Sequence, residues 1–447
     1  MICSILNFAY KFIGRLQEQT RKQVRMSLYF LIFFFALLYG SVLSNVHLLV
    51  KCIIGTVFMA GAIIFSMTGS VKRPKWDPVL TILWLAVGLL QLISSIFVSL
   101  EYLPMTCIWL VGFPALFIVW TNRRDYKILF GEVAAAANWS FLVMVVVSVV
   151  FAPVRNKAYG AIFHNENAVG QWITFAFPFV AFLSFQAKSK SKKILYWVES
   201  TLIYVLCILS RGRTALLAIL GMTIIFLVFW LVSRPGSFSL VGKKAVAFLL
   251  VAIVSASVFM GANRLSAAIN LSLPYIDELE DDELISPEEM ESGPSALQLL
   301  WDRILGVDKG SQSVNDYSSG RVGIWIAALE KTNLLGHPSR DHIITKRNGD
   351  VGNNAHNTVI QFIYNNGLIA GIIYALMMLY SGIKMLIRAI RNRSLQRTEI
   401  YLLMIHCGFW CTAMLASIDL PFLYLITFAY YLSYAPLLDR GETAAGR

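Results

Sequence analysis

Uninterrupted apolar runs of roughly 20 residues recur along this chain, and they limit what it can fold into. A helix of that length crosses the hydrocarbon layer of a bilayer, so each run is a candidate membrane span. Hydrophobic residues make up 57% of the chain and charged residues only 14%, whereas a soluble domain is nearer half apolar and a quarter charged. The sequence therefore predicts an all-α polytopic membrane protein.

We expect about twelve transmembrane helices. The first is interpreted as a retained span and not as a removed signal peptide, because no small-residue cleavage site follows it. The predicted spans are 26–45, 52–69, 79–99, 103–121, 128–152, 168–186, 194–210, 214–233, 245–261, 368–387, 399–416 and 420–437.

Basic residues predict the orientation of these spans. Short connections on one side carry "KRPK" (72–75), "NRRDYK" (122–127), "KSKSKK" (188–193) and "RAIRNR" (388–393). Because short cytoplasmic loops are rich in Lys and Arg, we expect these loops and both termini to be cytoplasmic. The net charge of +12 is scattered among the loops and not gathered on one domain, so no nucleic-acid partner is expected.

One connection is far longer than the others. The segment 262–367 would form a large extracytoplasmic loop, between N-terminal transmembrane helices in 1–261 and C-terminal ones in 368–447. We expect it to fold into a small helical subdomain over the membrane face. Its acidic stretch "DELEDDELISPEEME" (277–291) fits a solvated segment, with a divalent-metal site as the alternative.

Two arginines depart from the charge pattern of the short outer loops. "ILSRGRTALLA" (208–218) places Arg211 and Arg213 in a very short outer connection between two spans. Their side chains could snorkel to the lipid headgroups. A pair of guanidinium groups at a partly dry boundary is also suited to bidentate phosphate binding, and the sequence leaves both readings open.

Two further outer segments carry polar side chains. "YGAIFHNENAVGQW" contains Asn165 and Asn167 just before a span, where they could cap a helix or bind sugar hydroxyls. "SSGRVGIWIAALEKTNLLGHP" places Arg321, Trp325 and Leu329 at four-residue spacing, on one face of a predicted helix. A solvated arginine is the simpler explanation there.

A titratable histidine stands at the entry to a late apolar run. "AHNTVIQFIYNNGLIAGIIYALMML" opens with His356 and Asn357, and "NNG" interrupts it before the apolar sequence resumes. Asn-Gly is a helix-stop signal, so we predict a short surface helix over 356–365 and a span that begins near Leu368. Structural and catalytic roles for the histidine both fit this position.

Helical spacing assigns faces to that short helix. If it begins at His356, then His356, Ile360 and Tyr364 share one face, whereas Asn357 and Gln361 share the next.

In combination, these motifs resemble the O-antigen ligase and polymerase family of bacterial envelope glycosyltransferases. The matching pieces are "GAIFHNEN", "RTALLA", "GRVGIWIAAL" and "HNTVIQFIYNNGLIAG", in that order and around a large outer loop between late spans. One departure is "LLGHPSRD", which replaces the more usual Gly-x-Gly turn. The resemblance implies a GT-C-like fold and a place in the bacterial plasma (inner) membrane.

The resemblance also implies a reaction. A glycan would pass from undecaprenyl diphosphate to a hydroxyl of a glycan or lipid A-core acceptor, with inversion at the anomeric carbon. Arginines would stabilise the leaving diphosphate, so neither metal nor cofactor is expected, and His356 would accept a proton or orient a substrate group. The implied catalytic residues are His356, Arg213 and Arg321, and the implied substrate-binding residues are Arg211, Asn165, Asn167, Asn357 and Trp325.

Other functions stay open at this stage. A polymerase of O-antigen or capsule repeat units, or a ligase that glycosylates protein or another wall polymer, would carry the same motifs. Twelve spans would also suit a transporter or flippase, with Glu132, Glu199 and His406 as candidate intramembrane groups. A scaffold in a polysaccharide export complex is a further alternative. The outer arginines and the long outer loop favour an enzyme.

Overall fold

The computed structural model describes most of the chain and is almost entirely helical. The predicted acidic stretch 277–291 lies outside the described residues, so its interpretation stays a prediction. The structure describes residues 1–41, 46–123, 126–152, 158–163, 165–233, 238–268, 321–338, 341–345, 351–352, 354–418 and 420–439.

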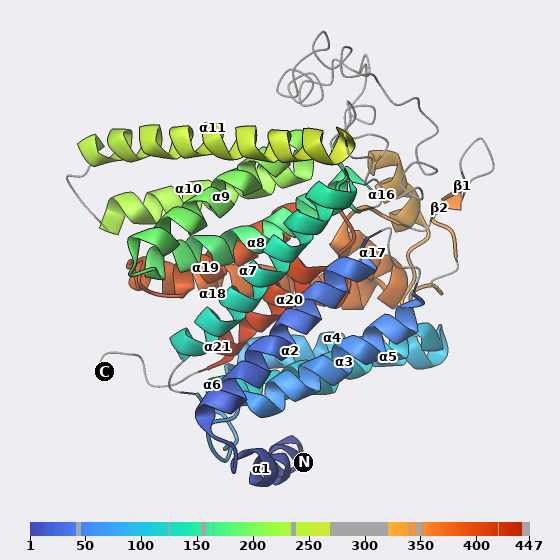
Figure 1. Cartoon of the computed structure of the whole chain (residues 1–447). Helices are drawn as coiled ribbons and strands as arrows, with labels where there is room; N and C mark the ends of the chain where they lie inside the picture. Colours follow the sequence, from blue (N-terminus) through green and yellow to red (C-terminus); the bar gives the residue numbers. More distant parts are fainter. Residues whose placement is uncertain are drawn as a thin grey trace.

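Up to residue 268, helices follow one another along the chain with short connections (Figure 1). The N-terminal helices are α1 (Ile2–Ile13), α2 (Glu18–Tyr39), α3 (Leu48–Phe65), α4 (Pro78–Phe97), α7 (Tyr126–Phe151), α8 (Glu166–Gln186), α9 (Lys190–Ser210), α10 (Arg213–Ser233) and α11 (Phe238–Ala268). Between α4 and α7 lie η1 (Leu100–Tyr102), α5 (Leu103–Cys107), the π-helical turn η2 (Ile108–Gly112) and α6 (Phe113–Thr121). The C-terminal elements are α16 (Arg321–Glu330), α17 (Thr358–Asn366), α18 (Leu368–Arg391), α19 (Glu399–Ala413), α20 (Leu425–Leu432), α21 (Tyr434–Leu438) and the antiparallel pair β1 (Ile344–Thr345) and β2 (Val351–Gly352).

The long apolar helices confirm a multi-pass membrane protein. Among the described residues, nine helical segments are long and apolar enough to cross a membrane, and they match nine of the predicted spans in order. The other three predictions, 52–69, 399–416 and 420–437, fall on the shorter apolar helices α3, α19 and α20–α21. The count of twelve therefore stays a prediction.

The basic connections gather at one end of the helix bundle, which we call the basic end. Asn122 Oδ1 accepts a hydrogen bond of 2.9 Å from the backbone N–H of Lys72, which joins two of these connections. Ser233 Oγ donates to the Arg393 carbonyl at 2.5 Å, so the end of α10 meets the connection after α18. Connections that the sequence assigns to one side of the membrane thus lie together in space.

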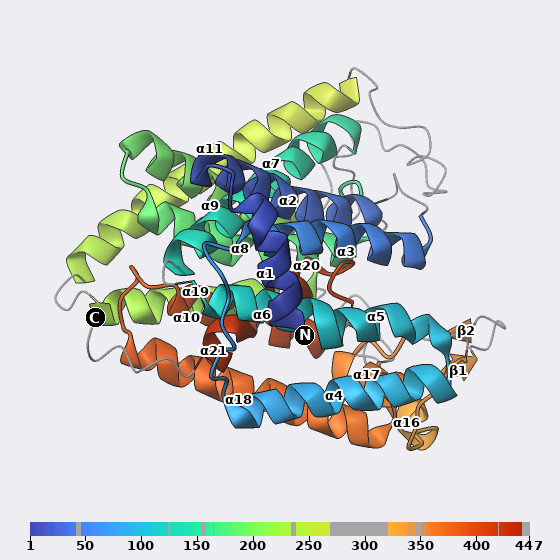
Figure 2. The ribbon, with the colours of Figure 1, turned by 90° about the horizontal axis from the view of Figure 1, so that it is seen from below.

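Two ion pairs, one of them buried, hold helices together near the basic end. Arg25 of α2 and Glu132 of α7 are both buried, and the Arg25 Nε donates to Glu132 Oε2 at 2.6 Å. Asp77 caps α4 by accepting from the Leu80 N–H at 2.9 Å, and its other oxygen meets Lys384 Nζ at 2.7 Å. This pair ties α4 to α18, which lie side by side in Figure 2.

The opposite end, the site end, carries α16, α17 and the two short strands (Figure 1). Ala328, Ile343, Ala355 and Tyr364 form a small apolar cluster that packs α16 onto α17. Ser94 Oγ of α4 donates to the Asn365 carbonyl at 3.0 Å, which fixes this layer to the long helices below it.

The predicted break before the late span is confirmed. Asn366 ends α17, Gly367 has φ 90°, and α18 begins at Leu368. A side chain at position 367 would place its Cβ 2.0 Å from the carbonyl oxygen of Leu334, so only glycine fits this turn.

The predicted start of the short helix is wrong by two residues. Asn357 is the N-cap and α17 begins at Thr358, because the Asn357 side chain accepts the first free N–H groups of the helix. His356 precedes the cap with φ 49°, in the left-handed region, and so does not share a helical face with Ile360 and Tyr364.

Candidate active site

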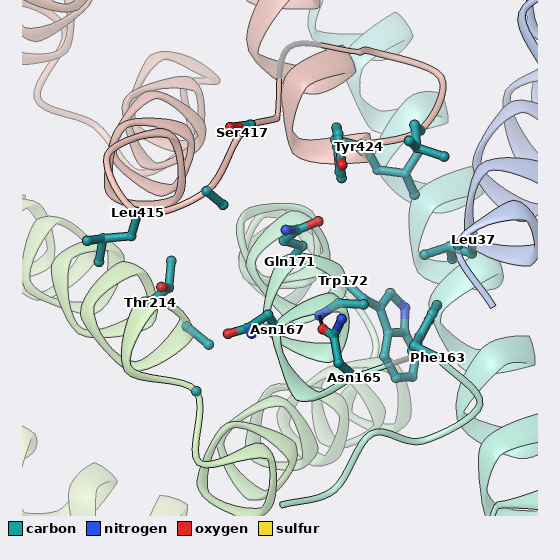
Figure 3. A pocket seen from close by; sticks show the side chains of 18 of the residues that line it. Leu37, Phe163, Asn165, Asn167, Gln171, Trp172, Thr214, Leu415, Ser417 and Tyr424 are labelled. Carbon is teal, nitrogen blue, oxygen red and sulfur yellow. Dashed lines mark hydrogen bonds between the residues drawn. The ribbon is translucent and has the colours of Figure 1, made fainter. Parts of the chain in front are cut away.

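A cavity of about 440 Å³ opens at the site end, where seven separate parts of the chain meet. Figure 3 shows side chains from the start of α8, Asn165, Asn167 and Gln171, around one space with Thr214 of α10 and Tyr424. Segments far apart in sequence thus enclose one volume, which we call the first cavity.

The starts of α8 and α10 approach closely beside the first cavity. A Cβ added at Gly170 of α8 would lie 2.8 Å from the Cβ of Ala215 on α10, so glycine permits this contact. The close approach brings the asparagine motif next to Thr214 of the arginine motif.

The charged groups in the wall of the first cavity are cationic or titratable. Lys51, Arg321 and His356 line it, and its described lining contains neither Asp nor Glu. Lys51 is held by a 3.0 Å hydrogen bond from its Nζ to the Tyr39 carbonyl. Such a wall suits an anionic ligand, because each cation lowers the energy of a negative charge in a partly dry space.

The backbone fixes His356 at the edge of the first cavity. Its N–H donates to Asn354 Oδ1 at 2.7 Å, and Ser417 Oγ donates to the same oxygen at 2.8 Å. Burial lowers the pKa of the His356 imidazole, and the positive charge of Arg321 lowers that pKa further. The imidazole is therefore neutral, and able to accept a proton, at neutral pH.

Arg321 and Trp325 lie on α16, as the sequence predicts, but they differ in position. Arg321 lines the first cavity. Trp325 is not among its lining residues, and its Nε1 donates to the Ala355 carbonyl at 2.9 Å. Trp325 thus holds the backbone directly before His356, while its predicted contact with substrate stays a prediction.

The three predicted asparagines also differ in position. Asn165 caps α8 by accepting from the Ala168 N–H at 3.1 Å, and it lines the first cavity together with the exposed Asn167. Asn357 is buried, caps α17 and donates from Nδ2 to the Met414 carbonyl at 3.2 Å. It is not among the residues that line the first cavity.

Arg211 and Arg213 flank the turn between α9 and α10. Arg211 has φ 51° and ends α9, whereas Arg213 is the first residue of α10. Gly212 between them and Thr214 after them line the first cavity, but the two arginines are not in that lining. Their short connection, predicted from the sequence, is therefore located beside the first cavity.

Sequence reasoning missed several residues of the first cavity, among them Lys51, Gln171, Asn354 and Tyr424. Lys51 had a detectable signal, because it is a lysine at the predicted outer end of a span, where the charge rule disfavours it. Asn354 stands two residues before His356, but neither its spacing nor its type indicates the hydrogen bond to the histidine backbone.

A comparison with known protein families tests the resemblance to O-antigen ligases and polymerases. Residues 198–375 match a family model described as O-antigen ligase. This match supports the resemblance of the chain to the O-antigen ligase and polymerase family. The match runs from α9 into α18 and so contains Arg213, Arg321 and His356, while Asn165 and Asn167 precede it. No curated protein and no solved structure gives a significant match to the chain.

The family match points to an enzyme of the glycosyltransferase type, and the long apolar helices point to a multi-pass membrane protein. Within the ranges that the structure describes, no group of three or more His, Cys, Asp or Glu side chains is placed to hold a metal ion.

Proposed function

We propose that this protein is an inverting, metal-independent glycosyltransferase of the O-antigen ligase type. It moves a glycan from undecaprenyl diphosphate to an acceptor hydroxyl on the outer face of the bacterial plasma membrane. The observation that carries the proposal is that His356 and Arg321 line one cavity whose other charged lining residue is Lys51. The cavity combines a neutral base with positive charge, which this reaction requires.

The reaction needs stabilisation of a leaving diphosphate. The bond between the anomeric carbon and the diphosphate oxygen breaks, and its electron pair leaves with the lipid diphosphate. The guanidinium of Arg321 stabilises that growing charge, with Arg213 and Arg211 on the neighbouring turn. Each such donor contributes on the order of a few kcal/mol to stabilisation of the transition state.

The reaction also needs removal of a proton from the acceptor. The acceptor oxygen forms the new bond to the anomeric carbon, and its proton passes to the imidazole of His356. A lowered pKa keeps this imidazole in the basic form at neutral pH. Attack on the face opposite the diphosphate inverts the anomeric centre.

The orientation follows from charge. The basic end carries the Lys- and Arg-rich connections, so the positive-inside rule places it in the cytoplasm together with both termini. The site end then faces away from the cytoplasm, where a lipid-linked glycan is the available donor.

A carrier function has less support. Glu132 is paired with Arg25, and the buried His406 shares a 2.7 Å hydrogen bond between its Nε2 and Ser433 Oγ. Two of the three candidate intramembrane groups thus have hydrogen-bond partners within the fold, as structural residues do. The third, Glu199, is buried, and its carboxylate oxygens have no hydrogen-bond partner among the described residues.

The test is transfer by the purified protein in detergent from a labelled undecaprenyl-diphosphate glycan, with EDTA present. A ligase transfers it to lipid A-core, whereas a repeat-unit polymerase of the same family joins it to a second lipid-linked repeat unit. Transfer to either acceptor supports the proposal, and the labelled product separates the two. Absence of transfer to both, or loss of transfer only when EDTA is added, would contradict it.

A further inference from the structure

A second cavity of about 710 Å³ lies next to the first cavity. Asn354, Ser417 and Tyr424 line both, so these three residues form a shared wall between the two spaces. The far walls of the second cavity come from α4, the η1–α5 segment and α17. The shared wall contains the Asn354 side chain that holds the backbone N–H of His356.

Two buried amide side chains line the second cavity with acceptor atoms that have no hydrogen-bond partner among the described residues. These atoms are Gln91 Oε1 on α4 and Asn366 Oδ1 at the end of α17. Each residue is only 5% exposed. Buried polar atoms in native proteins are nearly always hydrogen-bonded, so two unpaired acceptors in one cavity indicate a ligand that brings hydroxyl or amide donors.

The chemistry of the second cavity differs from that of the first. Its described lining contains no Lys or Arg, and it includes the carboxylate residue Glu101, so it is poorly suited to a diphosphate. Apolar faces of Trp109 and Phe362 lie in the same lining. Apolar surface combined with a few placed polar groups is typical of a site for a neutral ligand, and a saccharide offers both hydroxyl donors and apolar C–H faces.

We propose that the second cavity binds the saccharide of the acceptor, with Gln91 and Asn366 as its hydrogen-bonding residues. This inference rests on the proposed function. With the diphosphate beside Arg321 in the first cavity, an inverting attack requires the acceptor to approach from the opposite side. The terminal hydroxyl of the acceptor then extends past Asn354, from the second cavity into the first, and reaches His356.

A binding experiment without donor tests this assignment. The probes are two soluble oligosaccharides, the lipopolysaccharide core and a single repeat unit, each added to the purified full-length protein in detergent. We expect one of them to raise the melting temperature of the wild type. The Gln91→Leu and Asn366→Leu variants should lose that shift, whereas Gln186→Leu at the basic end should keep it.

A labelling experiment on the wild type needs no variant. Cys52 lines the second cavity, whereas Cys107 is exposed outside it. The bound oligosaccharide should slow alkylation of Cys52 and leave that of Cys107 unchanged. Equal rates at Cys52 with and without both oligosaccharides would overturn the proposal.

Kinetics separate this proposal from the proposed function. Gln91→Leu and Asn366→Leu should raise the KM for acceptor by roughly five- to ten-fold, the effect of one lost neutral hydrogen bond, with the KM for donor unchanged. A wild type without transferase activity would refute the proposed function. A wild type that transfers glycan, with variants that change only the KM for donor, would refute the acceptor site alone.

Discussion

The indole Nε1 of Trp325 donates a hydrogen bond to the carbonyl oxygen of Ala355 at 2.9 Å. Ala355 is buried in the cluster that joins α16 to α17, and the next residue is His356 with φ 49°. A histidine in the left-handed region costs energy unless neighbouring contacts hold it there. The helix that presents Arg321 to the first cavity therefore also fixes the backbone of His356.

The first prediction concerns this hydrogen bond. Trp325→Phe keeps the aromatic ring but removes the donor, so we expect kcat to fall about two- to ten-fold with the KM for donor unchanged. Trp139→Phe on α7 is the matched control, because Trp139 is 60% exposed on the outer surface of the bundle. Steady-state kinetics with varied donor provide the measurement. A normal kcat for Trp325→Phe would exclude a positioning role.

Substitution of His356 should remove the base without loss of the fold. Asn tolerates the left-handed backbone about as well as His, so His356→Asn isolates the chemistry, whereas His356→Ala adds some backbone strain. We expect transfer to fall by about 10²- to 10⁴-fold in both variants. Thermal unfolding in detergent should show a His356→Asn protein as stable as the wild type. Near-normal transfer by that variant would remove His356 from the mechanism.

The pH dependence should report the charge of Arg321. In the proposed mechanism His356 acts in its neutral form, so activity should fall as the pH drops through its pKa, which burial and Arg321 place below the ordinary histidine value. Arg321→Gln removes a positive charge and raises that pKa, so the acid limb should move to higher pH. The measurement is kcat/KM between about pH 5 and 8. Arg264→Gln serves as the control variant. If the acid limb of the Arg321→Gln profile lies at the same pH as in the wild type, the charge of Arg321 does not lower the pKa of His356.

The turn between α9 and α10 yields a prediction on donor use. Arg213→Ala should lower kcat/KM for the lipid-diphosphate donor by about 10- to 100-fold, and Arg213→Lys should restore only part of it, because lysine lacks the bidentate fork. Arg393→Ala at the basic end is the control. Complete rescue by lysine would show that charge alone suffices.

Two glycines offer a matched test of stability. Gly367→Ala places a Cβ 2.0 Å from the Leu334 carbonyl oxygen at φ 90°, so it should destabilise the fold by at least about 1–3 kcal/mol. Gly69→Ala meets nothing within 4 Å and should leave the melting temperature nearly unchanged. Comparison of the two melting temperatures in detergent checks the prediction. Equal values would mean that the α17–α18 turn is less constrained than its geometry indicates.

Local properties of the sequence were sufficient to predict much of the fold. The length of an apolar run determines whether a helix can cross a bilayer, and the Asn-Asn-Gly sequence before Leu368 predicts the break between α17 and α18. The basic connections predicted to share one side do meet, as the contact between Asn122 and Lys72 illustrates. These features depend on neighbouring residues and on charge counts, which the sequence displays directly.

Which residues line the first cavity depends on packing between segments that are far apart in the sequence. Lys51, Asn354 and Tyr424 join the first cavity only because α3, the segment before His356 and the start of α20 converge at one end of the bundle. Trp325 and Asn357 stand at motif positions, yet their side chains bond to the protein backbone: Trp325 to the Ala355 carbonyl, and Asn357 to the Met414 carbonyl and the first N–H groups of α17.

The sequence by itself determined a membrane-spanning helical chain with a histidine and arginines near one end. Only the tertiary structure decided which of them share a cavity, and that a second cavity with two unpaired amides adjoins it. The physical reason is that hydrophobic length and charge are properties of short segments. The direction and burial of a side chain are set by contacts between segments up to hundreds of residues apart.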